Sequence, residues 1–103
     1  MTFAQTAACV GGYVFSPRPG APAGAARSSD CLLHVVHVWP YPGYFEIGLV
    51  EWNGAAGVPR TLDEFYDRVR PTACEAGAEV VIGQPNPDGK YTRGVLLVPY
   101  RAR

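Results

Sequence analysis

The chain has 103 residues, of which 48% are hydrophobic and 17% are charged, with nine basic and nine acidic side chains. This length fits a single domain, and the hydrophobic share is sufficient for a core. Because the charges balance and the arginines are scattered, the composition gives no electrostatic support for binding nucleic acid or an anionic membrane. No apolar run approaches the roughly 18 residues of a membrane-spanning helix.

The first 30 residues are predicted to form a flexible N-terminal tail. The stretch 16–29, SPRPGAPAGAARSS, has no large apolar side chain, so its burial cannot offset the entropy lost on ordering it. The short apolar sequence YVF at 13–15 either docks on the domain or belongs to the tail. We therefore predict a tail or linker over 1–30 and a folded domain over 31–103.

Cys9 is a candidate for lipidation. The sequence TAAC at 6–9 ends as a lipoprotein cleavage site ends, with two small residues before a cysteine. Residues 1–8 are too short to form a complete signal peptide, so lipidation needs an export signal that these residues do not supply. The alternative is an ordinary cysteine in a mobile tail.

The folded part is predicted to begin with two strands. CLLHVVHV at 31–38 is rich in β-branched side chains, and YFEIGLVEW at 44–52 has an alternating apolar face. The residues between them include two prolines and are consistent with the loop of a hairpin.

A helix is predicted from Thr61 to Gly77. Thr61 is a favourable N-cap, and Glu64 completes a capping box three residues later. Apolar side chains recur at helical spacing until Gly77, a residue that favours helix ends. Pro71 removes one backbone donor and is expected to kink or divide the helix near Arg70.

Two more strands are predicted after the helix, over 78–83 and 91–101. The turn between them contains Asp88 and Gly89, which accept the backbone angles of a tight turn. The resulting order, β-β-α-β-β, predicts an α+β fold. We expect a four-stranded, mostly antiparallel sheet with one helix packed on one face.

Cys31, His34 and His37 are three residues apart and belong to the types that bind zinc or copper. Side chains alternate along a strand, so the two histidines point to opposite faces, and Cys31 lies about 20 Å from His37. We therefore predict no metal site and no cofactor. A small cytosolic metal- or ligand-binding protein that uses these cysteine and histidine residues is the alternative.

A second alternative is a thiol enzyme in which Cys74 pairs with one of the histidines. Cys74 lies near the C-terminal end of the predicted helix, where the helix dipole raises the pKa of a thiol and disfavours the thiolate. The sequence has no other arrangement typical of a catalytic site. We predict no catalytic residue and a protein that is not an enzyme.

The stretch VWPYPGYF at 38–45 gathers four aromatic rings around two prolines and a glycine. Such a loop either forms a binding patch or caps the edge of the core. If it forms an interface, Trp39, Tyr41 and Tyr44 are the candidate anchors.

The three cysteines leave two interpretations open. All three are free thiols in a cytosolic protein, or Cys31 and Cys74 form a disulfide while Cys9 carries a lipid. The second interpretation needs an oxidising compartment.

ACEAGAEVVIG at 73–83 resembles the helix-to-strand junction A-x-x-x-G-A-D-A-V-I of small bacterial envelope domains, which include the YbjQ-like family and the RcsF-like outer-membrane lipoproteins. The pattern before it resembles lipoproteins of unknown function from high-GC proteobacteria. That resemblance covers roughly residues 31–98 and is carried by Cys31, Pro42, Tyr44, Ile47, Gly48, Val50 and Thr61. The chain departs from it at Pro71, at Glu79 and in lacking the four-cysteine framework of RcsF.

The resemblance implies an exported β-β-α-β-β domain of the periplasm or outer membrane. It also implies lipidation through Cys9 as the only membrane contact, at most one bridge between Cys31 and Cys74, and binding of a protein partner or a homo-oligomer. We therefore expect a non-enzymatic envelope domain that acts by protein binding or self-association.

Overall fold

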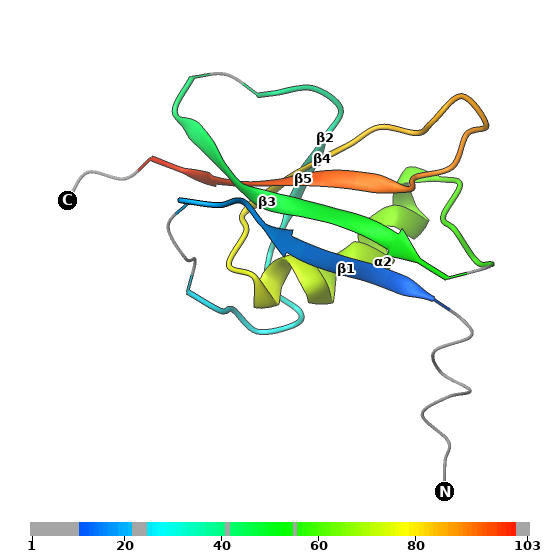
Figure 1. Cartoon of the computed structure of the whole chain (residues 1–103), viewed down its shortest axis with the longest axis horizontal. Coiled ribbons are helices and arrows are strands. Elements are labelled where there is room, and N and C mark those ends of the chain that lie inside the picture. Colours follow the sequence, from blue (N-terminus) through cyan, green and yellow to red (C-terminus); the bar gives the residue numbers. More distant parts are fainter. Residues whose placement is uncertain (1–10, 22–24, 41, 55, 101–103) are drawn as a thin grey trace, which may run out of the picture.

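Five strands and one helix make up the part of the chain that is described, residues 11–21, 25–40, 42–54 and 56–100 of a computed structural model. The strands form one mixed sheet and the helix packs on one face, which confirms the predicted α+β class (Figure 1). In chain order the elements are β1 (Gly12–Pro17), β2 (His34–Val36), β3 (Tyr44–Asn53), α2 (Leu62–Glu75), β4 (Val80–Gly83) and β5 (Arg93–Pro99).

The strand order in the sheet is β1-β3-β5-β4-β2, so β1 and β2 lie at opposite edges. Every neighbouring pair is antiparallel except β2 and β4, which are parallel. The sheet is mostly antiparallel as predicted, but the predicted hairpin between 31–38 and 44–52 is wrong. The reason is that β4 offers β2 an apolar partner: Val35 lies beside Val81 in the register, and the partly buried Val35 packs against the core to which Val81 belongs.

The sheet has five strands rather than the predicted four because residues 12–17 of the expected tail form β1. The Tyr13 ring is buried and makes edge-to-face contacts with Trp52 at 5.1 Å and Phe65 at 5.4 Å between centroids. The burial of one aromatic side chain thus offsets the entropy that is lost when a short strand becomes ordered. The tail prediction is wrong for 12–17, whereas residues 1–10 lie outside the described part of the chain.

The helix α2 begins and ends as the sequence predicts. The Thr61 side-chain oxygen accepts a hydrogen bond from the Glu64 backbone at 3.2 Å. Gly77 has a φ of 87°, and its N–H donates to the Cys74 carbonyl at 3.0 Å, which is the usual arrangement of a glycine that ends a helix. α2 is one helix through Pro71, so the predicted division near Arg70 does not occur.

The helix approaches the sheet where two glycines pair across β4 and β5. Gly83 lies opposite Gly94, and the buried Phe65 ring of α2 packs over both. A Cβ atom added at Gly83 would lie 2.4 Å from the Phe65 ring, and one at Gly94 would lie 3.1 Å from it. These glycines therefore leave the space that a large aromatic side chain fills.

Gly83→Ala is expected to lower the free energy of unfolding by about 1–3 kcal/mol, because the added methyl group displaces the Phe65 ring. Urea unfolding measures the change. The matched control is Gly12→Ala in β1, where an added Cβ meets nothing within 4 Å and stability should hold or rise slightly. Equal losses in the two variants would contradict the packing argument.

The stability of the fold is expected to fall in alkaline solution because of Tyr13. Its hydroxyl donates to the Tyr91 carbonyl, and burial raises its pKa above the ordinary value of 10.0, outweighing the lowering by Arg68. The folded state therefore retains a proton that the unfolded chain loses, so the full free energy of unfolding is present below about pH 10 and declines above it. Urea unfolding at about pH 8 and about pH 11 should show a smaller decline for Tyr13→Phe than for the wild type.

Candidate functional site

A crossover connection, defined as residues 18–33, joins β1 at one edge of the sheet to β2 at the other. Its residues 25–33 lie on the same side of the sheet as α2 (Figure 1). A disulfide joins Cys31 in this connection to Cys74 in the last turn of α2, with the Cα atoms 5.9 Å apart. The disulfide that the sequence left as one of two possibilities is present in the structure.

Arg27 fixes the crossover connection to the C-terminal end of α2. Its backbone N–H donates to the Cys74 carbonyl at 2.9 Å, and its guanidinium donates to the carbonyls of Ala78 at 2.8 Å and Leu32 at 3.1 Å. The last turn of α2 contains no basic residue. Arg27 therefore supplies, from outside the helix, the positive charge that the negative end of the dipole favours.

Arg70 holds the same connection from the helix side. Its guanidinium donates to the carbonyl oxygens of Cys31, at 2.9 Å, and of Asp30, and it lies over the Tyr66 ring at 5.5 Å. The Asp30 carboxylate accepts a hydrogen bond from the Ser28 hydroxyl, which, ahead of the Arg70 charge, lowers the pKa of Asp30. Two arginines and one disulfide thus help to order a segment in which the buried large apolar side chain is Leu33.

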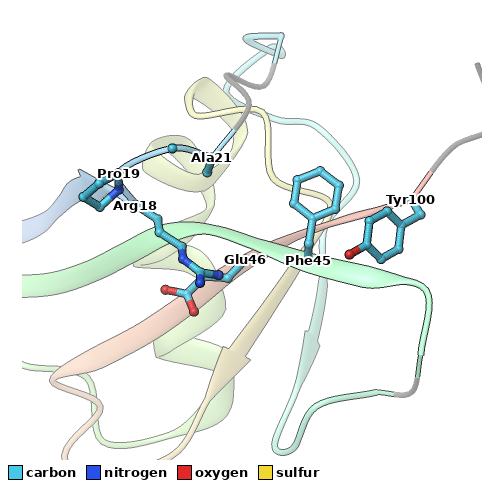
Figure 2. Close-up of a pocket in the computed structure, with 7 residues that line it drawn as sticks. Arg18, Pro19, Ala21, Phe45, Glu46 and Tyr100 are labelled. Carbon is cyan, nitrogen blue, oxygen red and sulfur yellow. The ribbon is translucent and has the colours of Figure 1, made fainter.

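The start of the crossover connection forms one wall of a pocket of about 350 Å³. Phe45 at the start of β3 and Tyr100 after β5 form an aromatic wall, with ring centroids 4.9 Å apart. Figure 2 shows the Arg18 side chain directed toward Glu46 on another side of the pocket. The pocket therefore combines an apolar, aromatic surface with one positive and one negative side chain. Its lining residues are Arg18, Pro19, Gly20, Ala21, Phe45, Glu46 and Tyr100.

Of the predicted interface residues, Trp39 and Tyr44 lie near this pocket in sequence but are not among its lining residues. Trp39 is 45% exposed in the β2–β3 connection, Tyr44 is partly buried at the start of β3, and Tyr41 lies outside the described residues. Sequence reasoning missed Tyr100, which is 66% exposed. The pairing of β3 with β5 brings Tyr100 beside Phe45. No local pattern in the sequence predicts which strands pair.

The other sequence candidates are separated in the structure. Cys74 is fully buried in the disulfide, so it is not a free nucleophile in this form, and neither it nor Cys31 is a thiolate ligand. His34 and His37 are exposed, and the described residues contain no group of three or more potential metal ligands. Cys9 lies outside the described residues. In the same part of the chain, no helix has the length and apolar character needed to cross a bilayer.

The chain matches no protein-family model, no curated protein and no solved structure. The resemblance to YbjQ-like and RcsF-like envelope domains therefore stays a prediction from the sequence.

Removing the disulfide with Cys31→Ala and Cys74→Ala together should lower the free energy of unfolding by about 4 kcal/mol. The bridge closes a loop across a sequence separation of 43 residues, and the unfolded chain gains the corresponding freedom. Urea unfolding of the oxidised wild type and the double variant measures the difference, with Cys9→Ala as the control that removes a cysteine without opening the bridge. A loss below about 1 kcal/mol would contradict the assigned role.

Proposed function

We propose that this chain is a disulfide-stabilised, non-enzymatic domain of an oxidising compartment, the bacterial cell envelope, and that it acts by binding a protein partner or a second copy of itself. The observation that carries the proposal is the bond between Cys31 and Cys74. Structural disulfides persist in the periplasm and on cell surfaces and are rare in the cytosol, where thiols are kept reduced.

The position of the bond supports a structural role. It ties the crossover connection to α2 beside Arg27 and Arg70, and Cys74 is fully buried. Redox-active cysteines are usually accessible to solvent, whereas Cys74 is not. A buried Cys74 beside hydrogen-bonded backbone carbonyls instead suits a permanent structural disulfide that stabilises a small domain.

The surface supports a binding role. Large aromatic side chains are exposed at Trp39 and Tyr100, and Tyr100 forms the wall of the pocket with Phe45. Aromatic residues and arginine are enriched at the centres of protein interfaces, and Arg18 lies in the same pocket. Lipidation of Cys9 completes the proposal as the means of attaching the domain to the membrane.

The test is the redox state of the cysteines in cells that express the chain from its own gene. Acid-quenched cells are treated with an alkylating reagent before or after reduction, and mass spectrometry follows the peptides that contain Cys31 and Cys74. We expect both residues to be alkylated only after reduction. Alkylation of both without reduction, together with recovery of the protein in the cytosolic fraction, would overturn the proposal.

A further inference from the structure

The two cysteines of the disulfide lie in different surroundings. Cys74 is in the last turn of α2 and has 0% of its surface exposed. Cys31 is partly exposed in the crossover connection, three residues before β2. Both are held in place, because the Arg27 N–H donates to the Cys74 carbonyl and Arg70 donates to the Cys31 carbonyl, each at 2.9 Å. The bond therefore has one buried end and one end that lies at the surface.

The geometry of thiol–disulfide exchange depends on this difference. A thiolate attacks one sulfur atom from the side opposite the other sulfur, which then leaves, so the rate depends on access to the attacked atom. Attack on Cys74 Sγ would need a path through the atoms that bury this residue. Attack on Cys31 Sγ comes from the side of the crossover connection, where the residue is partly exposed. Access therefore favours Cys31.

The charges beside Cys31 also favour an approaching thiolate. The Arg70 guanidinium donates to the carbonyls of Cys31 and Asp30, and the Arg27 guanidinium donates to the carbonyl of Leu32. A thiolate is an anion, so these two cations beside the Cys31 backbone attract it. The Asp30 carboxylate, which interacts with Arg70, opposes this attraction in part. Two positive charges against one negative charge leave an excess that suits the attacking group.

We propose that Cys31 is the site at which small monothiols of the glutathione class enter this disulfide, giving a mixed disulfide on Cys31 and a free thiol at Cys74. The thiolate sulfur forms a bond to Cys31 Sγ while the bond between Cys31 and Cys74 breaks. Cys74 Sγ leaves with the electron pair and takes up a proton, so the exchange involves no net oxidation or reduction. The proposal rests on the structural disulfide of the proposed function and specifies how thiols reach it.

The fold also favours the return of the bond. The departing Cys74 thiolate forms in a fully buried position, which disfavours its charge. Hydrogen bonds from Arg27 and Arg70, together with the buried Leu33, still hold the crossover connection after the exchange. Cys31 therefore stays beside Cys74, which attacks Cys31 Sγ in turn and expels the small thiolate. The folded domain thus restores its disulfide when the excess of monothiol is removed.

Mass spectrometry of the oxidised full chain tests the site. The Cys9→Ala variant, which lacks the third thiol, is incubated with excess glutathione, quenched with acid and alkylated with a maleimide in denaturant. Trypsin then places Cys31 on peptide 28–60 and Cys74 on peptide 69–90. In the folded protein, the glutathione adduct on Cys31 is expected to exceed that on Cys74 at least about tenfold, because access selects the attacked sulfur.

The same chain unfolded in urea is the matched control, because both sulfur atoms are then accessible. The two adducts should form there to about the same extent. An equal division between Cys31 and Cys74 in the folded protein, or the same preference for Cys31 in urea, overturns the proposal. The absence of any adduct on the folded protein, at a glutathione concentration that labels the unfolded chain, also overturns it.

Removal of the excess glutathione tests the return of the bond. The adduct is isolated in acid and brought to neutral pH, where Cys74 of the folded chain is expected to expel glutathione and restore the disulfide. In urea the two cysteines are separated by 43 residues of flexible chain, so the return should be slower. Equal rates in the two conditions overturn the role given to the crossover connection.

These outcomes are separable from failure of the proposed function. If both cysteines are reduced in cells but purified oxidised chain forms its adduct on Cys31, the envelope-domain proposal falls and the site of exchange stands. A disulfide that is intact in cells, combined with an adduct on Cys74 in the folded protein, does the reverse.

Discussion

The attachment of the crossover connection to the end of α2 is the constraint on which the rest of the sheet depends. β1 and β2 are consecutive in sequence but lie at opposite edges, so the chain between them must pass along the helix side of the sheet. Hydrogen bonds from Arg27 and Arg70 to backbone carbonyls, and the bond between Cys31 and Cys74, hold that path. Without them, the buried Leu33 and the three residues of β2 would remain to hold this end of the chain on the sheet.

The attached segment reaches two exposed regions of the molecule. Arg18 at the start of the connection lines the pocket, and Leu32 near its end is exposed beside β2. Loss of the disulfide would therefore disturb two separate regions through one segment. This arrangement is typical of small domains, in which a covalent bond replaces part of the core that a longer chain would supply.

Local signals predicted the local structure of this chain. The Thr61 cap, the apolar stripe and Gly77 predicted α2, and the apolar runs predicted most of the strands, because each depends on residues close in sequence. The sequence did not reveal that 12–17 joins the sheet or that β2 pairs with β4. Those features depend on contacts between distant residues: a single buried ring at Tyr13, and arginines that bond to backbone carbonyls rather than to other side chains. For the same reason the sequence did not indicate the pocket residue Tyr100, although it did indicate the aromatic stretch 38–45.

The helix α2 restricts which backbone groups β1 can offer to an approaching strand. A sheet with two open edges has a valence of two and can add copies without end, as fibrils do. Here the Thr72 hydroxyl occupies the Tyr13 carbonyl, Arg68 occupies the carbonyl of Gly11 just before β1, and Pro17 has no N–H, so this edge offers an approaching strand fewer backbone groups than a bare strand would. A helix that packs on a sheet can thus also reduce the tendency of an edge strand to join another chain.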